Sequence, residues 1–160
     1  LKGLLYVALG DDVNFINALS FARDRGIQIN EVRSSQSKEY VNAIEVAVET
    51  DQARRTIEGT LFGNREMRFV RIDESYIEVA PSAHMLFASN KDMPGVIGML
   101  GSILGENKVN IANMSVGRNI KGGNALTIIN VDSKLSESVT QKILSDKRML
   151  FAKPIHLQNL

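Results

Sequence analysis

The residues with the clearest chemical character lie at 90–98 (Asn-Lys-Asp-Met-Pro-Gly-Val-Ile-Gly), between a strand pattern and a helical pattern. The start of a helix offers unpaired backbone N–H groups and a positive dipole end, which together suit a carboxylate. Gly95 allows a ligand close to the backbone, and Asp92 is suited to an ammonium group. Asn90 and the more distant Asn110 can each donate and accept hydrogen bonds. These groups together predict a site for a small zwitterion such as an amino acid.

The same stretch also has a purely structural interpretation, which the local residues favour. Asp92 then only caps the helix, and the Pro94-Gly95 pair only shapes the turn. Pro94 suits the first helical position, because the N–H that it lacks would have no partner there. Both interpretations stay open at the level of the residues.

A second candidate lies in the first half of the chain, where residues 59–64 (Gly-Thr-Leu-Phe-Gly-Asn) precede several arginines. Asn64 together with Arg68 and Arg71 could hold an anion. The alternative is a hairpin turn followed by arginines on a solvated strand face, which is the usual place for arginine.

Other kinds of chemistry have little support in the residue types. The sequence has no cysteine and only two histidines, which excludes disulfides, thiolate zinc sites and a cysteine nucleophile within these 160 residues. No cluster of His, Asp and Glu has the spacing of metal ligands, and Ser102 has no histidine partner for a hydrolase triad. We therefore expect neither a catalytic centre nor a metal site in this chain.

The composition narrows the class of protein further. Hydrophobic residues make up 44% and charged residues 23%, as in ordinary globular domains. The net charge of +1 argues against a nucleic-acid partner bound by phosphate neutralisation. No apolar run approaches the ~18 residues that span a bilayer, and no signal peptide begins the chain, so we expect a cytoplasmic protein without a membrane partner. Because the chain begins with Leu1 and not Met, we also expect it to be part of a longer protein.

Charge divides the chain into two parts. Residues 1–83 carry 10 basic and 13 acidic side chains, whereas residues 84–160 carry 9 basic and 5 acidic ones. The change falls near Pro81-Ser82-Ala83, which predicts a domain boundary between residues 83 and 84.

The first part, 1–83, is predicted to be a small α+β domain with an antiparallel sheet. Helices are expected at 1–9 and 14–25, the second ended by Gly26. Strands are expected at 27–30, 44–49, 55–62, 67–72 and 76–79. We expect the first strand of this sheet to be missing from the chain, which would leave an edge that can pair with a neighbour.

The second part, 84–160, has the rhythm β-α-β-β-α-β. The expected elements are a strand at 84–90, a helix ending near Asn107, strands at 110–118 and 125–131, a helix capped by Ser136, and a strand at 149–157. This order is typical of the ferredoxin-like α+β fold, in which two helices cover one face of a four-stranded antiparallel sheet.

Several motifs in this second part carry a family resemblance. Residues 84–158 resemble an ACT domain, a βαββαβ module that binds amino acids, through residues 90–98, 109–114, 116–118, 122–126 and 130–132. Residues 1–83 resemble the allosteric-substrate-binding domain that precedes the ACT domain in long-form D-3-phosphoglycerate dehydrogenases. That match rests on residues 12–18, 23–27 and 59–63.

The resemblance implies the regulatory C-terminal part of an enzyme that oxidises 3-phosphoglycerate with NAD in serine biosynthesis. The part of the enzyme that this chain resembles contains no GxGxxG nucleotide-binding loop and no catalytic Arg, Glu and His residues. NAD is therefore expected only in the catalytic part outside this chain. L-serine, or a similar small amino acid, is the implied feedback effector, bound between self-associating ACT domains of adjacent subunits. The implied effector residues are Asn90, Asp92, Pro94, Gly95, Val96, Ile97 and Asn110. Arg68 matches one position of the family's anion site.

Two alternatives to this interpretation remain. An iron–sulfur L-serine dehydratase carries the same two kinds of domain, and its cluster ligands would lie outside this cysteine-free chain. A dimerisation module without a ligand is the other alternative. The residues that precede Leu1 in the parent gene would discriminate between the dehydrogenase and the dehydratase.

Overall fold

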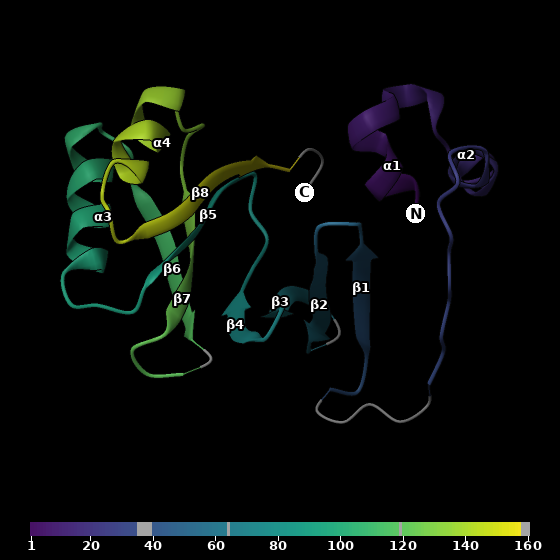
Figure 1. Cartoon of the computed structure of the whole chain (residues 1–160), viewed down its shortest axis with the longest axis horizontal. Coiled ribbons are helices and arrows are strands. Elements are labelled where there is room, and N and C mark those ends of the chain that lie inside the picture. The colour runs from purple at the N-terminus through teal and green to yellow at the C-terminus, as the bar shows by residue number, and fades with distance from the viewer. Residues whose placement is uncertain (35–39, 64, 119, 158–160) are drawn as a thin grey trace. The chain divides into compact units, whose positions relative to one another are not determined.

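The computed structural model describes residues 1–34, 40–63, 65–118 and 120–157, in two compact units, Leu1–Gln36 and Ser37–Leu160. Figure 1 labels the elements of both units. Across the described residues, no helix has the length and apolar character needed to cross a membrane. The division at Gln36/Ser37 does not test a domain boundary between residues 83 and 84, which stays a prediction.

The first unit is helical. It contains α1 (Lys2–Leu9), the short 3₁₀ helix η1 (Gly10–Asp12) and α2 (Ala18–Asp24). Its small core consists of Leu5, Val13, Ala18 and Ala22.

The helix α2 begins four residues later than the sequence predicts. The side-chain Oδ1 of Asn14 accepts hydrogen bonds from the backbone N–H groups of Ile16 (2.8 Å) and Asn17 (3.0 Å), which makes a turn before the helix. The strand predicted at 27–30 is wrong, because these residues are irregular. The described part of this unit contains no strand. The backbone groups around Ile27 and Ile29 therefore have no neighbouring strand in this unit with which to form sheet hydrogen bonds.

The second unit begins with an antiparallel four-stranded sheet in the order β1-β2-β3-β4. The strands are β1 (Ala43–Glu49), β2 (Arg54–Phe62), β3 (Glu66–Ile72) and β4 (Ser75–Val79). They confirm the other four strands predicted for the first half of the chain.

The rest of this unit is the predicted βαββαβ arrangement, so the α+β fold class is confirmed. Its elements are β5 (His84–Lys91), α3 (Val96–Glu106), β6 (Ile111–Arg118), β7 (Asn124–Val131), α4 (Glu137–Leu144) and β8 (Met149–His156). All strand pairs are antiparallel and the sheet order is β6-β7-β5-β8. Figure 1 shows α3 and α4 together on one side of this sheet.

The starts of the two helices test two predictions. Ser136 caps α4 as predicted, since its Oγ accepts a hydrogen bond from Val139 N at 3.4 Å. The placement of Pro94 at the first helical position is wrong, because α3 begins at Val96. Gly95 precedes the helix with φ +86°, a left-handed conformation that separates Pro94 from the helix.

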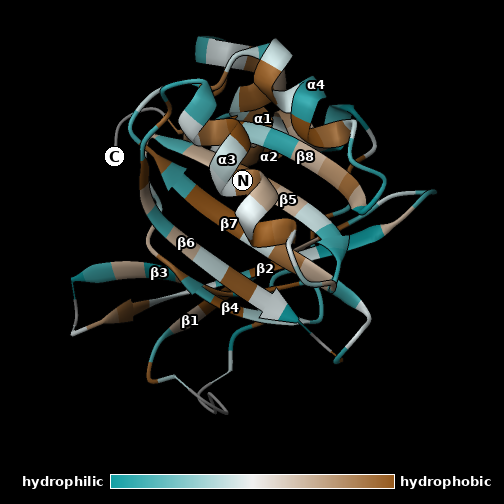
Figure 2. Ribbon diagram, turned by 90° about the vertical axis from the view of Figure 1, so that its left-hand side faces the viewer, coloured by the Kyte–Doolittle hydropathy of each residue, from teal (hydrophilic) through white to brown (hydrophobic). Residues whose placement is uncertain are grey.

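The central strands β5 and β7 of this sheet are buried on both faces. Leu86, Ala88 and Ile129 face the core under α3 and α4, whereas Met85 and Ile128 face a second core shared with β4. Seven consecutive residues of β7, from Ala125 to Val131, are consequently buried, and Figure 2 shows this strand as mostly hydrophobic.

The backbone of β6 lies very close to β4. A Cβ atom added to Gly117 would collide with the Tyr76 carbonyl oxygen and stand 3.2 Å from the Ile77 Cβ. Ser115 Oγ donates to the Glu78 carbonyl at 2.7 Å. Only glycine leaves room for this contact, so Gly117 allows β4 to pack against the sheet.

We expect Gly117→Ala to destabilise the fold by about 1–3 kcal/mol, because the added methyl group collides with backbone atoms. Urea unfolding monitored by circular dichroism measures this loss. The control is Gly101→Ala inside α3, where a Cβ meets nothing within 4 Å. The control should gain about 0.5–1 kcal/mol from the better helix former, and equal stability of the two variants would contradict the close approach.

Candidate functional site

The loop between β5 and α3 is held from both sides by backbone hydrogen bonds. Lys91 N donates to the Arg148 carbonyl at 2.9 Å, which ties the loop to the turn before β8. Asp92 N donates to the Gly123 carbonyl at 2.8 Å, which ties it to the β6–β7 hairpin. The loop therefore has a fixed shape where the helix begins.

Asp92 does not cap α3, so the predicted capping role of this residue is wrong. Its Oδ2 accepts from Gly122 N at 3.0 Å and from Arg118 Nη1 at 3.1 Å, and the N-cap residue Gly95 provides no side-chain cap. The Gly122 N–H, and after it Arg118, hold the pKa of Asp92 below its usual range. An ionised carboxylate therefore lies on the loop that leads into α3, and the N–H groups at the start of this helix have no side-chain acceptor at the N-cap.

Asn90 is buried under this loop. It is 3% exposed and lies on the helix-covered face of the sheet, two residues after Ala88. Its Nδ2 donates to the Lys91 carbonyl at 2.7 Å, and its Oδ1 accepts from Thr127 Oγ1 at 3.3 Å. These two hydrogen bonds fix the end of β5, so in this structure the Asn90 side chain has a structural role.

Asn110 lies at the opposite end of the sheet. Its neighbour Ile111 pairs with Val131, whereas Asn90 pairs with Ala125. These two positions are six residues apart along β7, or about 20 Å at the usual rise per residue. Asn110 Nδ2 donates to Asp132 Oδ2 at 2.6 Å. One copy of the chain therefore brings Asn90 and Asp92 together without Asn110.

Arg148 is a part of the site that the sequence interpretation missed. Its Nε and Nη2 donate to the two carboxylate oxygens of Asp146 at 2.9 and 2.6 Å, while Nη1 donates to the Pro94 carbonyl at 3.2 Å. The hydrogen bonds from Arg148 lower the pKa of Asp146 to about 2. No motif marks this clamp, because it depends on the pairing of β8 with β5.

The second predicted site has a different character. Arg71 contacts Glu45 at 2.7 Å and Glu58 at 2.8 Å, across neighbouring strands. Arg68 likewise contacts two carboxylates, those of Glu66 at 2.7 Å and Glu78 at 3.8 Å. Four carboxylates around two guanidinium groups leave little positive charge for an anion. Asn64 lies outside the described residues, and residues 59–62 lie inside β2 and not in a loop.

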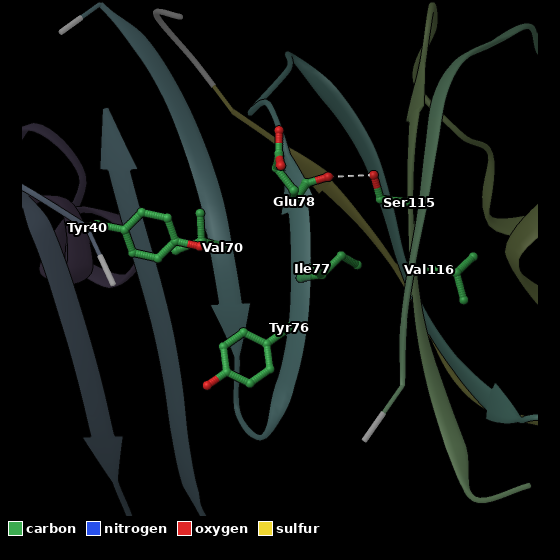
Figure 3. Close-up of a pocket in the computed structure, with 7 residues that line it drawn as sticks. All are labelled: Tyr40, Val70, Tyr76, Ile77, Glu78, Ser115 and Val116. Carbon is green, nitrogen blue, oxygen red and sulfur yellow. Dashed lines mark hydrogen bonds between the residues drawn. The ribbon is translucent and has the colours of Figure 1, made fainter. Parts of the chain in front are cut away.

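An open groove with a volume of about 340 Å³ lies around β4 and is lined by residues of β3, β4, β6 and the segment before β1 (Figure 3). The sequence does not reveal it, because its residues come from separate segments. They are Tyr40, Val70, Tyr76, Ile77, Glu78, Ser115 and Val116. Within the described parts of the chain, no group of three or more His, Cys, Asp or Glu side chains could hold a metal ion.

Comparison with known proteins identifies two families along the chain. Residues 1–73 match the D-3-phosphoglycerate dehydrogenase intervening domain, and residues 84–147 match the ACT domain. The chain thus belongs to the class of proteins in which this intervening domain precedes an ACT domain.

Relatives that match most of the chain identify the family within this class. The chain is 37% identical to D-3-phosphoglycerate dehydrogenase of Synechocystis over 89% of its length, and 34% identical to that of Bacillus subtilis over 98%. The enzyme of Archaeoglobus fulgidus is 35% identical over 89% of the chain. The chain spans 26%, 30% and 27% of these three proteins. The chain belongs to the D-3-phosphoglycerate dehydrogenase family and carries the regulatory ACT region of that family. This family assignment confirms the predicted resemblance to the dehydrogenase and favours it over the dehydratase alternative.

We expect Arg148→Gln to raise the pKa of Asp146 from about 2 toward about 3.9, the value of a free aspartate. NMR titration of the side-chain carboxyl measures this change. Because the folded pKa is depressed, the ion pair stabilises the fold fully above about pH 4. This contribution is lost as the pH falls through about 2. The variant should lose that acid dependence.

The matched control is Lys147→Gln, which removes the adjacent positive charge and leaves the guanidinium fork in place. Asp146 should still titrate near 2 in this control. An unchanged Asp146 pKa in Arg148→Gln would contradict the clamp.

Proposed function

We propose that this chain is the regulatory part of a cytoplasmic, NAD-dependent D-3-phosphoglycerate dehydrogenase of serine biosynthesis. It binds L-serine, or a similarly small amino acid, as a feedback effector, and NAD belongs to the catalytic part outside this chain. The observation that carries the proposal is the ionised Asp92 beside the uncapped N-terminus of α3.

The two charged ends of an amino acid match these two features. The ammonium group pairs with the Asp92 carboxylate, and the ligand carboxylate accepts from N–H groups at Val96, Ile97 and the next residue, helped by the helix dipole. Pro94 and Gly95 shape the approach, and Gly95 has no side chain that would cover the helix start.

A second copy of the chain supplies the part that one copy lacks. β6 is an edge strand of its sheet, and Asn110 directly precedes it. In a two-fold pair that joins two β6 edges antiparallel, the start of one β6 lies beside the end of the other. Arg118 ends β6 and contacts Asp92, so Asn110 of the second copy comes to the Asp92 end of the first.

We expect isothermal titration calorimetry to detect L-serine binding to the full chain. Asp92→Ala should weaken the affinity by about 1.5–3 kcal/mol, the usual loss for a hydrogen bond to a charged group. Glu106→Ala is the control, because it removes another exposed carboxylate, one paired with Lys142 at 2.5 Å. Absence of binding to the dimeric wild-type chain would refute the proposal, and an unchanged affinity of Asp92→Ala would remove Asp92 from the site.

Mixing two variants tests whether one site uses two copies. Asp92→Ala and Asn110→Ala should each bind L-serine weakly alone. Randomly mixed dimers should recover about a quarter of the sites at full affinity, because each mixed dimer contains one intact site. If the mixture binds no better than the single variants, the two residues do not act across copies.

A further inference from the structure

The carboxylate that the proposed effector needs already has a cationic partner. Arg118 Nη1 lies 3.1 Å from Asp92 Oδ2, the same oxygen that accepts from Gly122 N. An ammonium group that approaches this oxygen meets a guanidinium group in its place. Ligand and Arg118 therefore compete for one acceptor.

The exposure of this ion pair keeps the free-energy cost of replacing Arg118 by a ligand ammonium group small. The Arg118 side chain is 57% exposed and that of Asp92 is 23% exposed. An ion pair whose cation is largely exposed contributes little net stability, because water solvates the guanidinium group when the partners separate. The freed guanidinium group can thus move into solvent at the end of β6.

The loop keeps its shape when Arg118 leaves. The bonds from Asp92 N to the Gly123 carbonyl and from Gly122 N to Asp92 Oδ2 run through the backbone of the hairpin. Neither bond uses the Arg118 side chain. The Asp92 carboxylate is held in place by the hairpin backbone, and only its counter-ion is exchangeable.

We propose that Arg118 is a resident counter-ion of Asp92 that the ammonium group of the effector displaces. This inference rests on the proposed function and adds a regulatory element to the same site. Displacement changes the charge at the end of the edge strand β6, where the guanidinium loses its carboxylate partner. Effector binding is in this way coupled to the surface that β6 offers to a second copy.

The test compares Arg118→Gln with wild type by calorimetric titration of the full chain with L-serine. Removal of the competitor should tighten L-serine binding about two- to fivefold, the range that follows from the small net strength of exposed ion pairs. Arg118→Lys keeps a competing cation and should bind nearly as wild type does. Lys121→Gln removes a positive charge of the same hairpin that acts on Asp92 only through space, so it controls for a general change in potential and should tighten binding less than Arg118→Gln does.

A second probe separates competition from a general loosening of the loop. Glycerate has a hydroxyl group where L-serine has its ammonium group, so it does not need the Asp92 carboxylate as a counter-ion. Arg118→Gln should leave glycerate binding, or its absence, unchanged. An equal gain for L-serine and glycerate would overturn the inference.

The outcomes also distinguish the two proposals. If wild type binds no L-serine, the proposed function fails and this inference fails with it. If wild type binds L-serine and Arg118→Gln binds it equally or more weakly, only the inference fails. Weaker binding would mean that Arg118 contacts the effector carboxylate directly. A gain in Lys121→Gln equal to that in Arg118→Gln would likewise overturn it.

Discussion

The burial of β5 and β7 on both faces is the constraint on which the second unit depends. Helices cover one face of these strands and β4 packs against the other, so neighbouring residues such as Met85 and Leu86 enter different cores. A shift of either strand by one residue would exchange the two sets of side chains. The register of the central strands is therefore fixed, and the loops at their ends inherit defined positions.

The candidate site draws its geometry from this fixed register. Polar groups gather where the apolar strands end, with buried Asn90 bonded to Thr127 and with Asp92 bonded to the neighbouring hairpin. The loop hydrogen bonds join backbone to backbone across three separate segments. A carboxylate that is already fixed by such hydrogen bonds loses little further conformational entropy when it binds a cation, which is the general advantage of preorganised sites.

Apolar patterning predicted most of the fold, because helices and half-exposed strands show a periodic apolar face and the central strands, buried on both faces, show short apolar runs. It failed at Ile27 and Ile29, where alternation exists without a neighbouring strand to complete the hydrogen bonds. It also failed at Pro94, since the conformation of Gly95 and not the proline decides where α3 begins. Both failures concern the backbone, its hydrogen-bond partners in the first case and its conformation in the second, and a pattern of side chains encodes neither.

The site was predicted less completely than the fold. The segment 90–98 was identified from its residue types, but the partners of its groups come from distant parts of the chain. Arg118 and Arg148 reach Asp92 and Pro94 only through strand pairing. The sequence identified the arginines of β3 but not the glutamates that pair with them. Three of these glutamates lie on the strands β1, β2 and β4, and the fourth, Glu66, lies on β3 near Arg68. Such contacts follow from sheet order, not from local spacing.

The separation of Asn110 from Asp92 along β7 has a consequence for how such a protein senses its ligand. A site that needs both residues belongs to a pair of chains, so a single dissociated chain cannot recognise the effector fully. Ligand affinity and chain association then share one coupling free energy, and each strengthens the other by the same factor. Dilution alone would make such a protein less sensitive to its effector, without any change in the residues of the site.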